Sequence, residues 1–362
     1  MTFRRDPVVP ARLTMKTLSH APWRKWLLLQ TAAGIGLVVG GARYYFTHPQ
    51  RVVATLPPDL APGSREVFLP GSDGVRLHGV WMGGHGTRTI IHHPGYSSCG
   101  GIVLARPAGF RLVRPVGVVS PWRPERGGAG GQQRGDRRGR ELVQGRQAQN
   151  GEPLTAWPLV RAALARGYNF LLVDARAHGK SDGPWDPKGM RAAGDLAGWV
   201  RWLREEQGQV RVGLWGNSFG SVLGLTLAAC PVEAVPNAGC GALDAMVLDS
   251  PAISGTGLYA GVIRAPLYWV VQPVIWHLAN GQLLEWLRQA DVTVPILLIH
   301  GMADTHVPAW HSQEAYKLLW SADAPERTEL WLVPGADHLE ALEVAGEAYI
   351  QRTLGWFDHW LI

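Results

Sequence analysis

The sequence predicts an α/β fold in which a mostly parallel β-sheet is covered by helices on both faces. Short apolar runs typical of buried strands alternate with helix-like segments from about residue 65 to the end of the chain. A Gly-x-Ser-x-Gly pattern stands between one such strand and the helix after it. With 362 residues, 46% of them apolar, the chain can form one large domain with appendages. Parallel strands need crossover connections, so this alternation favours a parallel sheet that is buried on both sides.

The expected elements begin with an antiparallel hairpin, because a turn-rich loop separates the first two apolar runs. Strands are expected at Glu66–Leu69, Val75–Met82, Thr89–His93, Asn169–Asp174, Val210–Trp215, Ala245–Asp249, Pro295–His300 and Glu329–Val333. Helices are expected at Leu159–Arg166, Met190–Glu206, Val222–Ala229 and Arg352–Leu361.

Ser218 is the candidate nucleophile. The segment from Gly213 to Ser221 joins an apolar strand to an apolar helix, and Ser218 stands at the tip of the turn between them. A strand, a tight turn and a helix around such a serine form a nucleophile elbow. The glycines of the pattern leave room for a strained backbone that lifts the hydroxyl out of the sheet. A turn of small residues is the alternative.

A base and an acid are expected after later strands. An activated serine needs a base, and the base needs a carboxylate that orients it. Catalytic groups of such sheets gather at the carboxyl ends of the strands. Asp304 follows the strand that ends at His300, and His338 follows the last strand. Asp249 also ends a strand and is the alternative acid, although its Asp-Ser-Pro sequence more often caps a turn.

Two backbone N–H groups are the candidate oxyanion hole. A tetrahedral intermediate needs hydrogen-bond donors for its oxyanion. Phe219, directly after the nucleophile, is expected to supply one donor. Tyr96, in the loop after the strand that ends at His93, is expected to supply the other.

Two further motifs are rejected as sites. Gly179-Lys180-Ser181 is similar to a phosphate-binding loop, but Asp174 stands where that motif requires its first glycine. His92-His93 lacks the i, i+4 spacing and the carboxylate neighbours of a metal site. A metal site is therefore not expected. Asp174 and His178 are expected to organise a loop.

The N-terminal region predicts a membrane anchor. Residues 1–25 hold six basic residues and one acidic residue, and an apolar run from Trp26 to Ala42 follows. These seventeen residues are close to the shortest length that spans a bilayer, and aromatic residues flank the run, so the anchor or signal segment is placed at 26–46. The preceding positive charge predicts a cytoplasmic N-terminus and a domain outside the cytoplasm. A cleaved signal peptide, and hence a secreted protein, is the alternative, since Gly40 and Ala42 satisfy a small-x-small cleavage rule.

The net charge of +6 is concentrated in two appendages. Residues 101–150 hold ten arginines and three acidic residues, and residues 1–25 carry a net +5, so the remainder carries −6. The body therefore gives no reason to expect a nucleic-acid partner. Residues 99–153 are rich in Gly, Arg, Pro and Gln and lack any helical or strand period. They are predicted to be a disordered insertion or a stretch of coding sequence read out of frame. An Arg/Gly tract that binds RNA or an anionic surface is the alternative.

The predicted layout is a basic segment 1–25, an anchor or signal segment 26–46, a linker 47–64 and an α/β domain 65–362. A Trp-rich stretch at about 252–292 is predicted to form a small helical cap over the active site. An apolar cap favours a hydrophobic substrate group or membrane contact, and ordinary helix packing is the alternative. The three cysteines give no disulfide framework, and both a Cys230–Cys240 pair and buried free thiols stay open.

Several motifs together resemble the α/β-hydrolase superfamily. They lie between Glu66 and Leu361 and are His93–Ser98, Val173–Ser181, Gly216–Gly220, Leu248–Pro251, Ile299–Asp304 and Gly335–His338. Within the superfamily the chain is similar to bacterial membrane-anchored serine hydrolases of the serine-aminopeptidase-like branch. The resemblance implies the α/β-hydrolase fold with an eight-stranded sheet, a Ser-Asp-His triad and no cofactor. Residues 99–153 depart from the family pattern.

These observations predict a serine hydrolase that works by acyl transfer to Ser218, with His338 as base and Asp304 as its orienting acid. Small-molecule carboxyl esters are the expected substrates, and peptides, amides and thioesters are alternatives for the same site. A membrane-tethered binding protein that keeps the fold without catalysis is the alternative from another functional class.

Overall fold

The computed structural model describes residues 22–49, 51–84, 86–96, 98–100, 102–104, 154–231, 234–235, 243–279 and 281–362. Side chains are described in this range except at 22–28, 102–104 and 154. Three predictions concern residues that lie largely or wholly outside this range. They are the basic segment 1–25, most of the insertion 99–153, and the pairing of Cys240 with Cys230. Cys99 and Cys230 are both buried.

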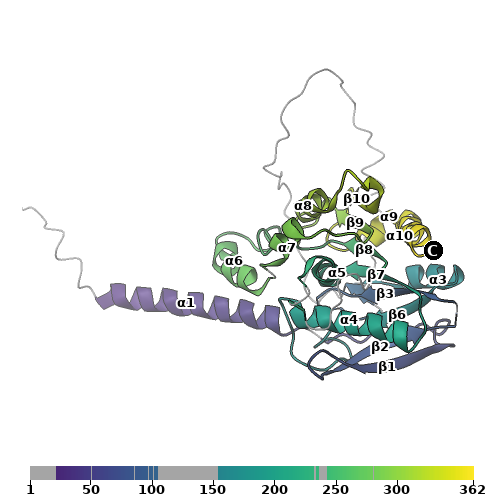
Figure 1. Ribbon diagram of the computed structural model, residues 1–362. Helices are drawn as coiled ribbons and strands as arrows, with labels where there is room; N and C mark the ends of the chain where they lie inside the picture. The colour runs from purple at the N-terminus through teal and green to yellow at the C-terminus, as the bar shows by residue number, and fades with distance from the viewer. Residues whose placement is uncertain are drawn as a thin grey trace, which may run out of the picture.

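An eight-stranded sheet in the order β1-β2-β6-β3-β7-β8-β9-β10 forms the centre of the molecule (Figure 1). β1 pairs antiparallel with β2, β2 pairs antiparallel with β6, and the other neighbours are parallel. The predicted α/β fold with its N-terminal hairpin is confirmed. The strands are β1 (Ser64–Pro70), β2 (Arg76–Met82), β3 (Arg88–His93), β6 (Asn169–Val173), β7 (Arg211–Asn217), β8 (Ala245–Asp249), β9 (Ile296–Gly301) and β10 (Thr328–Val333).

Helices cover both faces of the sheet (Figure 1). One face carries α4 (Met190–Glu205), α5 (Phe219–Ala229), α7 (Leu283–Gln289) and α8 (Trp310–Leu319). The other face carries α3 (Trp157–Ala165), α9 (Ala341–Ala345) and α10 (Glu347–Trp360). A short 3-10 helix (Pro325–Arg327) precedes β10.

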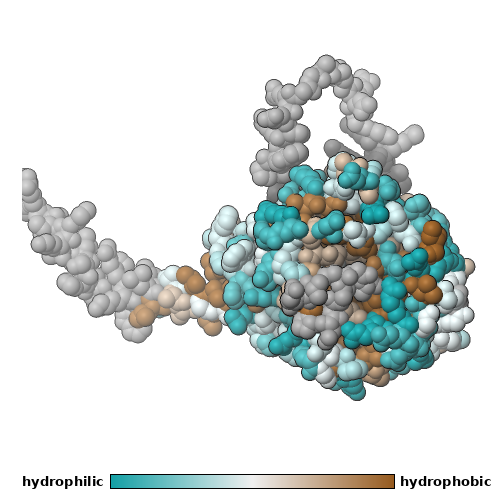
Figure 2. All heavy atoms as spheres, in the orientation of Figure 1, coloured by the Kyte–Doolittle hydropathy of each residue, from teal (hydrophilic) through white to brown (hydrophobic). Residues whose placement is uncertain are grey.

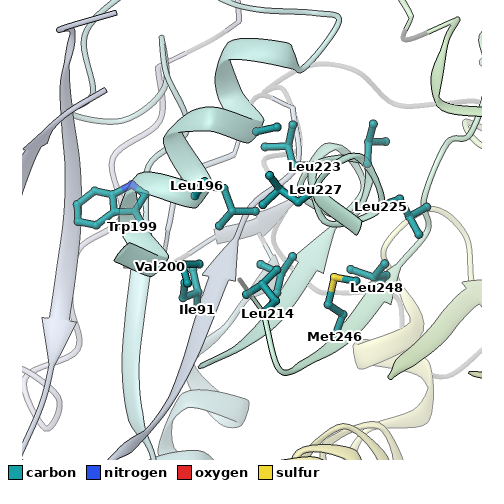
Figure 3. Packing of buried hydrophobic residues seen from close by; sticks show 14 of the residues in the cluster. Ile91, Leu196, Trp199, Val200, Leu214, Leu223, Leu225, Leu227, Met246 and Leu248 are labelled. Carbon is teal, nitrogen blue, oxygen red and sulfur yellow. The ribbon is translucent and has the colours of Figure 1, made fainter. Parts of the chain in front are cut away.

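Two apolar clusters lie on opposite sides of the sheet because successive strand residues point to opposite faces. Leu214 belongs to one cluster, and its neighbour Trp215 belongs to the other. In Figure 3, Leu214 and Met246 of the sheet lie below Leu196 of α4 and Leu223 of α5. Burial on both faces explains why these strands read as continuous apolar runs.

The predicted cap segment contains α6 (Leu267–Leu278) and α7, both between β8 and β9. α7 buries Leu283 and Leu287 in the main core. α6 buries Val271 and Ile275 in a separate small cluster. Trp269 and Trp276, by contrast, are 70% and 58% exposed, so these two side chains do not supply a buried apolar cap.

The segment predicted as a membrane anchor forms helix α1 (Pro22–Thr47), which projects from the body beside α6 (Figure 1). Apolar residues are visible along this helix in Figure 2, and Leu29 and Leu37 are 63% and 79% exposed. None of the described helices, α1 included, combines the length and hydropathy of a membrane span. The localisation of the protein stays a prediction.

The two ends of the predicted insertion lie side by side. β4 (Ile102–Leu104) pairs antiparallel with β5 (Leu154–Thr155), with Ile102 opposite Thr155 and Leu104 opposite Leu154. The chain therefore leaves and re-enters the domain at one place, as in a hairpin with a long connection.

Deletion of residues Arg106–Gln149 should consequently leave the domain folded. Ala105 and Asn150–Pro153 would then join β4 to β5, and five residues is an ordinary hairpin connection. We expect the thermal midpoint, followed by circular dichroism, to change by no more than about 4 °C, which is about 1 kcal/mol for a domain of this size. Loss of soluble, cooperatively unfolding protein would show that the deleted segment is part of the fold.

Candidate active site

The turn between β7 and α5 holds Ser218 in a strained backbone conformation. Ser218 has φ +50° and ψ −107°, a region that non-glycine residues rarely occupy and that costs about 1–3 kcal/mol. Two glycines permit this turn. A Cβ at Gly220 would lie 2.1 Å from the carbonyl oxygen of His93, and one at Gly216 would lie 2.8 Å from the backbone of Gly220. The backbone N–H of Ser218 donates to the carbonyl of Asp249 at 2.8 Å, which fixes the turn against β8.

Ser218, His338 and Asp304 are brought together from three separate loops. The distance from His338 Nε2 to Ser218 Oγ is 3.0 Å, and from His338 Nδ1 to Asp304 Oδ2 it is 2.7 Å. Asp304 follows β9 and His338 follows β10, so both stand at the carboxyl ends of parallel strands, as predicted. The three side chains form a continuous hydrogen-bonded relay.

The Asp304 carboxylate is buried and surrounded by donors. Its Oδ1 accepts the backbone N–H groups of His306 and Val307 at 2.9 and 2.7 Å. Its Oδ2 also lies 3.2 Å from Nε2 of His300. Burial alone would raise the pKa of Asp304, but the charge of His338 and the hydrogen bonds from both histidines hold that pKa well below 3.8. Asp304 is therefore an anion at neutral pH.

The electrostatics of His338 follow from this anion. Burial alone would lower the pKa of His338, and the adjacent Asp304 carboxylate more than offsets that effect, so the pKa is raised above 6.5. A raised pKa makes the imidazole a stronger base. The carboxylate on Nδ1 also fixes the tautomer, which leaves Nε2 facing the serine hydroxyl.

Asp249, the alternative acid, is placed behind the elbow. Its carboxyl oxygens accept hydrogen bonds from Ser250 Oγ at 2.8 Å and Tyr349 OH at 2.9 Å. Burial raises its pKa. Its backbone carbonyl supports Ser218, so Asp249 contributes to the shape of the turn while Asp304 is the partner of His338.

The candidate oxyanion donors Phe219 and Tyr96 belong to two segments that both adjoin Ser218. Phe219 is the first residue of α5, and the first N–H groups of a helix have no carbonyl acceptor within that helix. The positive end of the helix dipole favours negative charge there. On the other side, the loop that holds Tyr96 approaches closely: a Cβ at Gly95 would lie 3.1 Å from the Ser218 Cβ.

Sequence reasoning assigned no role to the residues that hold Asp304. His300 Nδ1 lies 2.6 Å from Ser312 Oγ, and His300 Nε2 lies 2.8 Å from the carbonyl oxygen of Val307, so the ring is fixed at both nitrogens. The His306 ring lies 5.3 Å from the ring of His338, and burial lowers the pKa of His306 to about 4. Asp337 accepts the backbone N–H and hydroxyl of Thr305. The only sequence signal for these residues was the motif from Ile299 to Asp304, which gives no side-chain orientation.

Asp304, His306 and Asp337 also bring three potential metal-ligand atoms within 4.8 Å of one another. Each carboxylate already accepts hydrogen bonds: Asp304 from His338 and two backbone N–H groups, and Asp337 from Thr305. The donor set is thus used to hold the acid loop, and we assign no ion to it.

The residues that were rejected as sites have structural partners. Asp174 accepts the backbone N–H groups of Gly100 and Lys180, both at 2.9 Å, and His78 Nδ1 lies 2.7 Å from it. His92 contacts the carbonyl of Gly100 and the amide oxygen of Asn217 through its two ring nitrogens. Asp174 therefore organises the loops after β3 and β6.

Comparison with known proteins is consistent with this architecture. Residues 151–251 match the family model described as the alpha/beta hydrolase fold, and residues 268–362 match the prolyl oligopeptidase family. The first match contains the elbow, and the second contains the loops of Asp304 and His338.

Two curated relatives share about half of the chain. An uncharacterized protein YfhR of Escherichia coli K12 is 28% identical over 200 residues, which is 55% of this chain and 63% of that protein. The human protein ABHD12B is 26% identical over 188 residues, which is 49% of each chain. The matched region thus spans less than two thirds of these relatives.

Solved structures agree over a larger part of the chain. Pyrococcus furiosus esterase Pf2001 superposes with a TM-score of 0.59 over 87% of this chain and 98% of its own, at 23% identity. The hydrolase GrgF of Penicillium superposes with a TM-score of 0.51 over 85% of this chain at 15% identity. These identities show a shared fold. Together with the family match over the elbow and the sheet order described above, they show that the chain has the α/β-hydrolase fold.

Proposed function

We propose that this protein is a serine hydrolase that cleaves small carboxyl esters through an acyl-enzyme intermediate. The observation that carries the proposal is the relay from Ser218 Oγ through His338 to Asp304, with contacts of 3.0 and 2.7 Å, at a strained strand-to-helix turn. An activated serine of this kind attacks carbonyl carbon.

In the first half of the reaction, Ser218 Oγ attacks the ester carbonyl while its proton passes to His338 Nε2. The negative oxygen of the tetrahedral intermediate accepts hydrogen bonds from the backbone N–H groups of Phe219 and Tyr96. The imidazolium, stabilised by Asp304, then donates its proton to the departing alcohol, and the Ser218 acyl ester remains. Water then attacks the carbonyl of the acyl-enzyme while His338 accepts its proton. Collapse of the second tetrahedral intermediate returns the proton to Ser218 Oγ and releases the carboxylic acid.

Two comparisons bear on the bond that is cleaved. The likeness to Pf2001, which is described as an esterase, favours ester substrates. The match of residues 268–362 to the prolyl oligopeptidase family favours peptide bonds as a second candidate. The same catalytic groups serve both reactions, so the two candidates are separated by assay.

Ser218→Ala should abolish hydrolysis of p-nitrophenyl butyrate. Because the nucleophile is lost, kcat/KM should fall by at least roughly 10³-fold, whereas Ser321→Ala, at an exposed serine after α8, should behave as wild type. The release of p-nitrophenol is followed spectrophotometrically, and a prolyl p-nitroanilide is assayed in parallel.

Preference for the anilide would select the peptidase candidate. A folded wild-type protein that hydrolyses neither compound would instead favour a binding protein that retains the fold.

Replacement of the two buried acids should separate their roles. Asp304→Asn removes the carboxylate that orients His338 and stabilises its protonated form, so kcat/KM should fall by roughly 10³–10⁴-fold. Activity requires neutral His338 and is lost as the pH falls through its pKa. Asp304 raises that pKa, so the residual activity of the variant should persist to lower pH. Asp249→Asn should shift the pH profile less than Asp304→Asn does, because Asp249 is a smaller cause of the raised pKa of His338 than Asp304 is and is not hydrogen-bonded to it.

The measurement is kcat/KM for the butyrate ester between about pH 5 and 9. A large loss in Asp249→Asn together with a small loss in Asp304→Asn would reverse the assignment of the acid.

A further inference from the structure

Helix α1 lies outside the α/β core, yet its C-terminal turns contact both sides of the candidate active site. On the acid side, Val38, Ala42 and Phe46 pack against a small apolar cluster of Leu258, Val271, Ile275 and Val307. Phe46 also meets Tyr259, with ring centroids 5.1 Å apart.

This cluster is joined directly to the acid loop. The backbone N–H of Val307 donates to Asp304 Oδ1 at 2.7 Å. The backbone N–H of Tyr259 donates to the carbonyl of His306 at 2.6 Å, and the rings of these two residues are 5.5 Å apart. α1 therefore rests on the segment that positions the catalytic carboxylate.

On the nucleophile side, α1 contacts the loop that carries the second oxyanion donor. The hydroxyl of Tyr96 donates to the backbone carbonyl of Tyr45, and their ring centroids are 6.3 Å apart. Tyr45 is 50% exposed, so it is only partly covered by its neighbours.

A series of aromatic side chains then leads from Tyr45 to the nucleophile, and we call it the aromatic row: Tyr45, Tyr96, Trp185 and Phe219. The Tyr96 and Trp185 centroids are 5.3 Å apart, and those of Trp185 and Phe219 are 4.4 Å apart. Tyr96, Trp185 and Phe219 are each half-buried. The row is thus a partly exposed apolar surface that begins at the residue after Ser218 and ends on α1.

We propose that the aromatic row is the subsite for the apolar acyl chain of the substrate and that α1, through Tyr45, forms its far end. The argument for this occupant is that the row is continuous with the catalytic centre. Phe219 directly follows Ser218, so the acyl chain of a substrate whose carbonyl is attacked by Ser218 would begin beside it. An apolar chain gains free energy by covering these rings. The inference rests on the proposed ester hydrolysis. It makes Tyr45 a residue that determines specificity for chain length.

The row offers a matched pair of variants. Tyr45→Ala removes the distal ring but keeps the backbone carbonyl that Tyr96 contacts. Tyr44→Ala removes the preceding ring of α1, which is 65% exposed and stacks on His48 instead. Both positions are exposed, so both proteins should fold, and Tyr45→Phe should restore the row.

The first measurement compares kcat/KM for p-nitrophenyl acetate and p-nitrophenyl decanoate in the full-length protein. Tyr45→Ala should reduce the decanoate value by about tenfold and leave the acetate value nearly unchanged, because only the long chain reaches α1. Tyr44→Ala and Tyr45→Phe should match wild type. Equal losses for both esters, or equal effects of Tyr44→Ala and Tyr45→Ala, would overturn the subsite.

A second measurement separates this inference from the proposed chemistry. Decanoate binding to Ser218→Ala protein is measured by calorimetry with and without Tyr45→Ala, which needs no turnover. Weaker binding by about tenfold in the double variant supports the subsite even if no ester is hydrolysed. Unchanged binding refutes the subsite even if the esterase activity is established.

Discussion

The candidate site depends on one close backbone approach, that of Gly220 to the carbonyl oxygen of His93. Any side chain at residue 220 would collide with β3, and only this approach lets the chain turn sharply enough to give Ser218 a φ of +50°. The cost of the turn is offset by burial of β7 and α5 in the main core and by the hydrogen bond from Ser218 N–H to Asp249. Ser218 is therefore presented by a strand and a helix that are both buried in the main core.

Asp304, the candidate acid, is held by hydrogen bonds within a polar loop that follows β9. Asp304 accepts two backbone N–H groups of its own loop and lies beside His300. Val307 of that loop packs against α1, and the His306 carbonyl of the same loop accepts the backbone N–H of Tyr259, which also contacts α1. Because α1 also meets Tyr96, a helix outside the core links the acid to the oxyanion loop. The loop of Asp304 and the loop of Tyr96 are thus both supported by α1, which belongs to neither loop.

The sequence was sufficient for the parts of the structure that local patterns determine. Buried strands are continuous apolar runs, and Asp304 and His338 were found because parallel strands end at one edge of the sheet. The contacts of α1 could not be predicted, since its apolar residues suit a bilayer and a protein surface equally well. The role of Asp337 was also hidden: it depends on the approach of Thr305, 32 residues away along the chain, to its carboxylate. Patterns along the chain predict elements, whereas these contacts arise only when loops are brought together.

The central claim is that Ser218 is an activated nucleophile, and chemical trapping tests it most directly. The full-length protein is treated with a fluorophosphonate, digested and sequenced by tandem mass spectrometry. The relay through His338 predicts one phosphonyl adduct, on the peptide that contains Ser218, and its loss when the protein is first unfolded. An adduct on another serine, or an unmodified Ser218 in protein that turns over esters, would contradict the account.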